Sequence, residues 1–77
     1  MIVFADRLTK LRLKRNLRQT DLARYLHIST SAISNYEQSI RYPDIELLVQ
    51  IADFFGVSTD YLLGRTNVLY PEKEAKG

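Results

Sequence analysis

The chain has 77 residues, contains no cysteine and carries a formal net charge of +2. This length suits one small domain, and the lack of cysteine excludes disulfide bonds and thiolate metal sites. No apolar run approaches the roughly 18 residues of a membrane span, and the first residues lack the pattern of a secretory signal. We therefore expect a single domain in a reducing, cytoplasmic compartment, with no membrane partner.

The charge is unevenly distributed along the chain. Residues 1–42 hold eight basic and three acidic side chains, a net charge of +5, whereas residues 43–77 hold three basic and six acidic ones, a net charge of −3. A basic half suits contact with a phosphate backbone. On charge alone, however, a solvated helix face explains the pattern better, and we assign Arg7, Lys10 and Lys14 to such a surface.

Hydrophobic spacing predicts five helices and no strand. The first three cover residues 3–16, 19–26 and 30–38, with Ser29 as the N-cap of the third. A fourth helix starts at Pro43-Asp44 and ends at Gly56. Its expected core stripe is Ile45, Leu48, Ile51, Ala52 and Phe55. A short fifth helix follows between Ser58 and Gly64.

The domain organisation follows from these elements. Residues 1–65 form the helical domain, and residues 66–77 form a C-terminal tail that is polar apart from residues 68–70. We expect this tail to be flexible or associated with a dimer interface.

The second and third helices are short and are separated by residues 27–29 alone. So short a turn makes two helices cross steeply, and the second can then enter a DNA major groove about 12 Å wide. Side chains that meet base edges must be short and must donate or accept hydrogen bonds. The candidates for base contact are Thr30, Ser31, Ser34 and Asn35. Outside this motif, they would be read simply as solvent-facing polar residues.

An ordered set of motifs extends from Leu8 to Leu63. Its members are Gln19, Ala23, Ser29, Ile33, Glu37, Pro43, Leu48, Gly56-Val57-Ser58 and Tyr61-Leu62-Leu63-Gly64. In this order, over about three quarters of the chain, they resemble the lambda-repressor/Cro-like helix-turn-helix family, also called the xenobiotic-response-element (XRE) family. No single element is specific, but the ordered set is.

The resemblance implies a compact, all-α, five-helix lambda-repressor-like fold and sequence-specific binding of double-stranded DNA. It places Thr30, Ser31 and Asn35 at base edges, with Ser34 close enough to join them. It implies a structural ion pair between Arg12 and Glu37. The residues expected to contact phosphates are Gln19, Gln38, Ser39, Arg41 and Tyr42.

The chain departs from the family pattern at four positions. His27 and Ser39 stand where glycine is usual, Arg18 stands at a threonine cap, and Ile40 replaces a common basic residue. A left-handed residue other than glycine costs about 1–2 kcal/mol, although histidine is among the residues enriched there. These departures predict a slightly strained turn and fewer phosphate contacts. We interpret His27, the one histidine, as this turn residue rather than as a metal ligand.

Apolar residues of the last two helices and the tail lie off the main core stripe. The dimer-interface candidates are Phe54, Tyr61, Leu63 and Leu69. An exposed apolar patch indicates an interface, and a homodimer suits two half-sites about 34 Å apart. The alternative is that the tail simply covers them.

The leading hypothesis is a homodimeric transcriptional regulator, expected to be a repressor on a palindromic operator. The alternative is an antitoxin-like or adaptor module that holds a regulatory protein partner with its last two helices. We expect no enzyme, no metal and no small-molecule cofactor. Glycine occurs only at positions 56, 64 and 77, and no set of catalytic side chains is visible.

Overall fold

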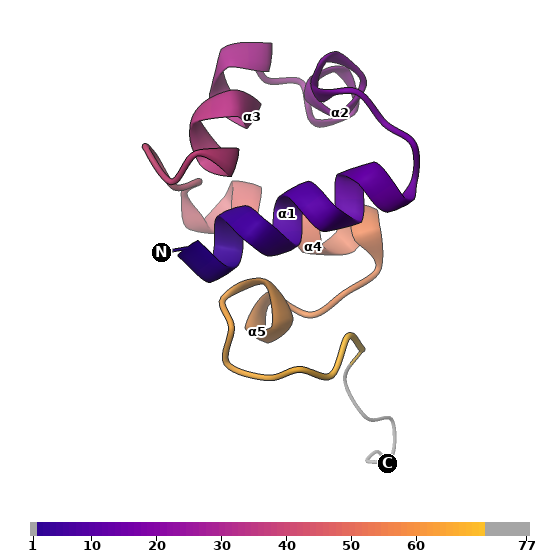
Figure 1. Ribbon diagram of the computed structural model, residues 1–77, viewed down its shortest axis with the longest axis vertical. Coiled ribbons are helices and arrows are strands. Elements are labelled where there is room, and N and C mark those ends of the chain that lie inside the picture. The colour runs from indigo at the N-terminus through magenta and orange to yellow at the C-terminus, as the bar shows by residue number, and fades with distance from the viewer. Residues whose placement is uncertain (1, 71–77) are drawn as a thin grey trace.

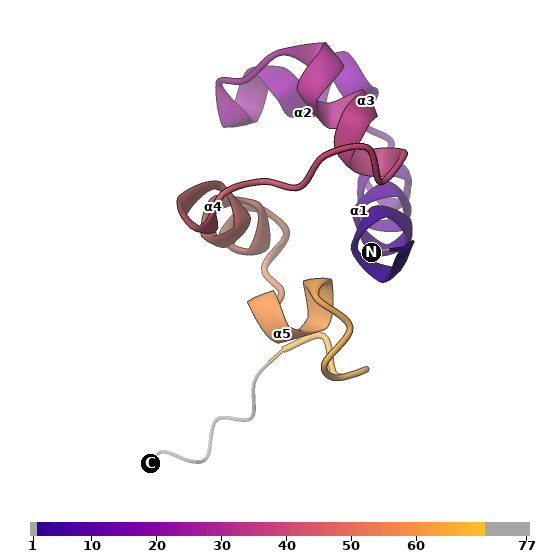
Figure 2. The ribbon, with the colours of Figure 1, turned by 90° about the vertical axis from the view of Figure 1, so that its left-hand side faces the viewer.

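The computed structural model describes residues 2–70, which contain five α-helices and no strand. They are α1 (Ile2–Lys14), α2 (Gln19–Leu26), α3 (Thr30–Glu37), α4 (Ile45–Phe55) and α5 (Thr59–Leu62). α2 and α3 form one end of the molecule and α5 lies toward the other, with α1 and α4 on two sides of the space between them (Figures 1 and 2). The predicted all-α fold is confirmed. None of the helices in residues 2–70 is both long and apolar enough to cross a membrane.

One buried cluster holds the helices together, and every helix contributes to it. Its members are Phe4, Leu8, Leu22, Ala23, Leu26, Ile33, Ile51, Ala52, Phe55, Val57 and Leu62. The core stripe expected on α4 is wrong at one position, because Ile45 is 80% exposed. Ile45 is the first residue of α4, so the packed stripe begins after the first turn of the helix.

Side-chain caps fix where three of the helices begin. Ser29, Asp44 and Ser58 accept hydrogen bonds from the backbone N–H groups of Ala32, Leu47 and Tyr61, at 3.0, 2.8 and 2.9 Å. Each cap satisfies a backbone donor that has no partner inside its helix. The predicted role of Ser29 is therefore confirmed, and α3 starts directly after it.

Left-handed residues end the helices and set the chain direction. Asn16, His27 and Ser39 have φ angles of 58°, 59° and 62°. His27 and Ser39 thus adopt the backbone that glycine usually supplies. Gly64 has a φ of 80°, and a Cβ atom there would lie 2.7 Å from Cγ1 of Val3. Glycine at position 64 therefore permits close contact between α1 and the end of α5.

The segment after α5 folds back onto the domain up to residue 70 (Figure 1). The backbone carbonyl of Leu69 accepts a hydrogen bond from the N–H of Ser58 at 2.9 Å, and the Leu69 side chain packs on the core. Residues 71–77 of the predicted tail lie outside the described residues. The division of the chain after residue 65 therefore stays a prediction.

Candidate nucleic-acid interface

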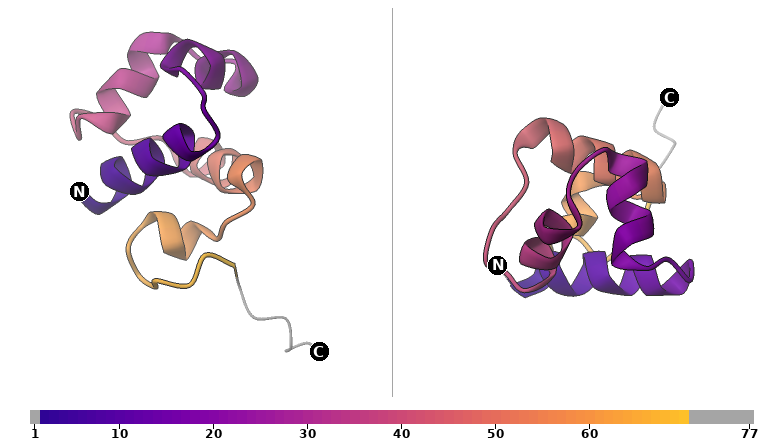
Figure 3. Two further views of the ribbon diagram at one scale, coloured as in Figure 1. Left: turned by 45° about the vertical axis from the view of Figure 1, so that its right-hand side comes forward. Right: turned by 90° about the horizontal axis from the view of Figure 1, so that it is seen from above.

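α2 and α3 form the helix-turn-helix. In Figure 1 α2 is seen nearly end-on while α3 runs across the view, so the two helices cross steeply. The turn between them is closed by His27, whose N–H donates to the carbonyl of Arg24 at 3.2 Å. This arrangement presents the N-terminal half of α3 at one end of the molecule (Figure 3).

The candidate base-contact residues all lie on α3. Thr30 and Ser31 are exposed, and Ser34 and Asn35 are half-buried. The side chains of Thr30, Ser31 and Asn35 make no hydrogen bond to any part of the chain from 2 to 70. Their polar atoms are therefore available to a ligand that lies along α3.

Ser34 differs from these three residues because its hydroxyl is held from the end of the helix. Gln38 Nε2 donates to Ser34 Oγ at 2.7 Å and to the Ser34 carbonyl at 3.2 Å. The hydroxyl keeps its own proton for donation. Gln38, expected at a phosphate, thus also orients a candidate base-contact residue.

A buried charged network anchors the far end of α3. Arg12 donates to Glu37 through Nε at 2.7 Å and Nη2 at 3.0 Å, and the two side chains are only 11% and 6% exposed. Arg12 Nη1 also donates to the carbonyl of Leu17 at 2.8 Å. The ion pair that the resemblance implies is therefore present, and it connects α1, the α1–α2 loop and α3.

Gln19 joins the same network from the start of α2. Its Nε2 donates to Glu37 Oε1 at 3.0 Å. An amide nitrogen carries two hydrogens, so one remains for a phosphate oxygen. Glu37 therefore fixes the side chain of Gln19 beside the N-terminus of α2, where the helix dipole favours an anion.

A second, exposed ion pair lies next to Gln19. Arg18 Nε contacts Asp21 Oδ2 at 3.1 Å, and the same oxygen accepts the Arg18 backbone N–H at 2.8 Å. The hydrogen bonds from Arg18 lower the pKa of the Asp21 carboxyl. Asp21 thus gives α2 a cap although Arg18 lacks the hydroxyl that is usual at this position.

The remaining candidate phosphate contacts follow α3 in one loop. The carbonyl of Asn35 accepts from the N–H groups of Ile40 at 2.9 Å and Arg41 at 3.3 Å. These bonds, with the left-handed Ser39, hold the loop close to α3. The Arg41 side chain is exposed and makes no ion pair or hydrogen bond within residues 2–70.

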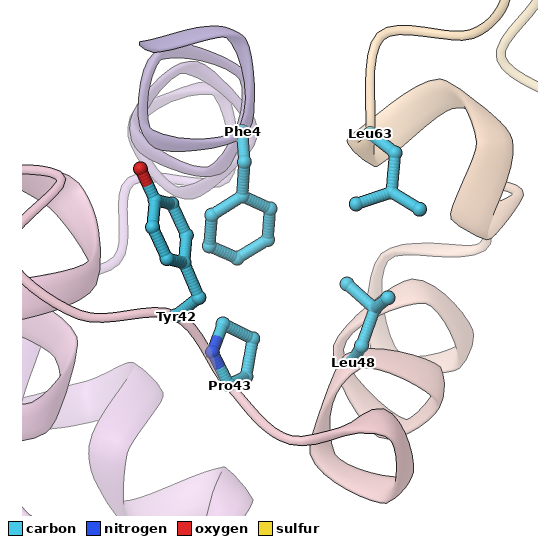
Figure 4. A pocket seen from close by; sticks show the side chains of 5 residues that line it. All are labelled: Phe4, Tyr42, Pro43, Leu48 and Leu63. Atoms are coloured by element: carbon cyan, nitrogen blue, oxygen red, sulfur yellow. The ribbon is translucent and has the colours of Figure 1, made fainter. Parts of the chain in front are cut away.

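Tyr42 closes this loop over an apolar cavity of about 300 Å³. The cavity is lined by Phe4, Tyr42, Pro43, Leu48 and Leu63, and its walls come from α1, the α3–α4 loop, α4 and the end of α5 (Figure 4). The ring of Tyr42 meets Phe4 edge-on, with 6.4 Å between centroids, and the residue is 51% exposed. The contact between Tyr42 and the buried Phe4 thus holds the loop against the core.

The four dimer-interface candidates do not form one patch. The Phe54 ring packs on Tyr25 at 5.3 Å, and Tyr61 lies under the Arg7 guanidinium at 4.1 Å. Leu69 packs on the core. Leu63, 36% exposed, lies at the apolar cavity instead. All four remain candidates for an interface.

Two arginines have structural roles that sequence reasoning missed. Arg7 donates to the carbonyls of Tyr61 and Thr66 and to Oδ1 of Asn67, so it is not the solvated residue that we expected. Arg15 donates to the carbonyls of Phe54 at 2.9 Å and Phe55 at 3.1 Å. One feature of the sequence could have indicated this role of Arg15. α4 has no basic residue in its own last turn, although the dipole of a helix favours a positive charge there.

Comparison with known proteins agrees with this geometry. A family model described as "Helix-turn-helix" matches residues 8–62. The HTH-type transcriptional regulators ImmR and AnsR of Bacillus subtilis are 40% identical over 62 residues and 43% identical over 60 residues. The HTH-type transcriptional activator BcrR of Enterococcus faecalis is 43% identical over 60 residues.

These matches cover 80%, 78% and 78% of this chain, but only 49%, 52% and 29% of ImmR, AnsR and BcrR. The chain thus spans about half or less of the length of these relatives. The shared part is the helix-turn-helix with the helices that support it. The chain therefore belongs to the helix-turn-helix family, in the XRE-type group of transcriptional regulators.

Proposed function

We propose that this domain binds double-stranded DNA in a sequence-specific manner and regulates transcription. The observation that carries the proposal is the contrast within α3. The side chains of Thr30, Ser31 and Asn35 are unengaged within residues 2–70, while Glu37 is fixed by the buried network. A rigid helix with unengaged short polar groups suits recognition in the major groove.

Each candidate residue has a distinct role in this proposal. Asn35 can pair through both amide atoms with an adenine edge, and the hydroxyls of Thr30, Ser31 and Ser34 can meet neighbouring bases. The phosphate contacts are assigned to residues near the C-terminal end of α3, where Gln19 bonds to Glu37 and the following loop begins. These residues are Gln19, Gln38, Ser39, Arg41 and Tyr42. Phosphate contacts set the register of the protein, and the base contacts supply specificity.

The finer proposal is a cytoplasmic homodimer that represses transcription from a palindromic operator. A dimer places two copies of α3 in half-sites about 34 Å apart. Leu63, exposed at the apolar cavity beside Leu48, is the interface candidate that its own chain covers least. A domain seated on an operator also blocks access of other proteins to that DNA, which is sufficient for repression.

The test is selection of bound duplexes from a random DNA library, followed by titration of the most enriched duplex at two salt concentrations. We expect a palindromic consensus and binding that weakens steeply with salt. Arg41→Gln should weaken binding to all duplexes alike and lower the salt slope by about 1. Enrichment of no sequence would contradict the proposal, and a single half-site would contradict the dimer.

An observation on α4 favours the second candidate function, a module that holds a regulatory protein partner. Ile45 and Val49 are 80% and 43% exposed and lie one helical turn apart. Such an apolar face is available for a protein partner. Selective DNA binding that depends on Asn35 would show that protein binding is not the sole function.

A further inference from the structure

A second cavity, of about 490 Å³, has no lining residue on α2 or α3. Its lining residues come from the second half and the end of α1, the end of α4 and the residues after it, α5, and the segment that follows α5. None of the candidate base or phosphate contacts lines this cavity. Its size falls within the range of about 300–1,000 Å³ that is typical of small-molecule sites.

The floor of this cavity is apolar. Phe55 and Val57 are buried, and Leu11 and Leu69 pack beside them on the core. All four line the cavity. This floor can remove an aromatic ring or a short acyl chain from water.

One wall of the cavity is cationic. Lys10 and Lys14 line it from successive turns of α1, Arg15 lines it directly after the end of that helix, and no acidic residue is among the lining residues. Lys10 has a carboxylate neighbour outside the cavity, Asp6, at 3.2 Å. Lys14 makes no ion pair or hydrogen bond within residues 2–70. Arg15 uses its guanidinium on two neutral carbonyls, so its charge is not neutralised.

Polar groups also line the cavity. Asn67 accepts from Arg7 through Oδ1 at 2.8 Å, and this bond does not use its NH₂ group. Tyr61 and Tyr70 are among the lining residues as well. The cavity thus combines apolar, cationic and neutral polar side chains, which is the composition of a ligand site.

We propose that this cavity binds a small organic anion with an apolar body, such as an aryl or acyl carboxylate. The apolar body lies on Phe55, Val57 and Leu69, and the acid group lies between Lys10 and Lys14. This site is separate from the DNA surface. The proposal therefore goes beyond DNA recognition and can be tested without DNA.

The experiment compares two fluorescent probes that differ in charge. We expect 8-anilinonaphthalene-1-sulfonate to bind the folded domain more tightly than N-phenyl-1-naphthylamine, which lacks the sulfonate. The double variant Lys10→Gln/Lys14→Gln should weaken the anionic probe by about tenfold, the combined effect of two partly exposed ion pairs. Arg24→Gln is the matched control, because Arg24 is an exposed cation of α2 that does not line the cavity.

Amide chemical shifts then locate the bound probe. We expect the largest changes at Leu11, Val57 and Leu69, with unchanged thermal melting of the lysine variant as the check on folding. Equal binding of the neutral probe, equal loss in Arg24→Gln, or shifts centred on the cavity at Leu63 would overturn the proposal. Because no DNA is present, none of these outcomes bears on DNA recognition.

Discussion

Two regions of the molecule use arginine in different ways. At the helix-turn-helix end, Arg12 is buried in a two-point ion pair with Glu37. Outside the helix-turn-helix, Arg7 donates to carbonyls of α5 and the segment after it, and Arg15 donates to carbonyls at the end of α4. Neither has a carboxylate partner within residues 2–70. The Arg12–Glu37 pair fixes the direction of α3. The bonds of Arg7 and Arg15 hold other chain segments against the core and leave the positive charge of both arginines without a counter-ion.

This difference has an energetic consequence. A buried ion pair contributes little net stability as a pair, but removal of one partner leaves the other charge buried and unpaired. Removal of an arginine that donates to backbone carbonyls leaves only neutral acceptors without that donor, and no unpaired buried charge. The helix-turn-helix end should therefore be the more sensitive of the two to single substitutions.

The largest effect is expected from Glu37→Ala. Loss of this carboxylate leaves Arg12 and Gln19 without their shared acceptor, and the cost is about 3–5 kcal/mol. Urea denaturation measures it. The double variant Arg12→Met/Glu37→Met should be less destabilised than Glu37→Ala, and equal or greater destabilisation would show that charge burial is not the cause.

The next largest effects are expected from two substitutions on α4, one at a core residue and one at a residue that lines the apolar cavity. Ile51 is fully buried, so Ile51→Ala should cost about 2–5 kcal/mol. Leu48 lines the open cavity, so Leu48→Ala should fall at the lower end of this range, because water already reaches part of the side chain. Thermal melting of both variants checks the order, and a greater loss for Leu48→Ala would contradict it.

Gly64→Ala tests the close approach at the α5 end. The new Cβ atom would lie 2.7 Å from Cγ1 of Val3 on a left-handed backbone, and the backbone alone costs about 1–2 kcal/mol. Gly56→Ala is the matched control, since it shares the left-handed backbone but has only a 3.8 Å neighbour in Tyr70. If the two variants melt alike, steric contact with Val3 does not matter.

The smallest effect is expected from Arg15→Met, which retains an apolar stem but removes the charge at the end of α4. The loss should be about 0.3–1 kcal/mol, the usual value of a cation at a helix C-terminus. Thermal melting at low and high salt measures it. A loss of stability as large as that of Glu37→Ala would contradict the contrast between the buried ion pair and the arginines that bind carbonyls.

Much of the fold could be predicted from the sequence because its signals are local. Ser29, Asp44 and Gly56 mark helix ends through short-range backbone chemistry, and all three occupy the expected positions. The resemblance supplied the Arg12–Glu37 pair, which joins residues far apart in the sequence. The hydrophobic spacing of α4 predicts that Ile45 lies in the core. Such spacing indicates which way a side chain points from the helix, but it does not show whether another element covers that side chain.

The contacts that sequence reasoning missed depend on tertiary structure. Arg7 meets Thr66 only because the chain returns along α1 after α5, and no spacing along the sequence encodes that return. The hydrogen bond from Gln38 to Ser34 is a local contact between residues four apart, but the family resemblance assigns both residues to DNA and implies no bond between them. The assignment of individual DNA contacts itself stays a prediction.

The central claim is that α3 reads bases through Asn35. Its most direct test is the affinity ratio of Asn35→Ala between the selected duplex and a shuffled duplex of equal length. A base contact of about 1–3 kcal/mol predicts that this ratio falls by about 5- to 150-fold relative to the unaltered domain, with little change on the shuffled DNA. Equal weakening on both duplexes would contradict the account, because Asn35 would then contribute to general DNA affinity and not to sequence recognition.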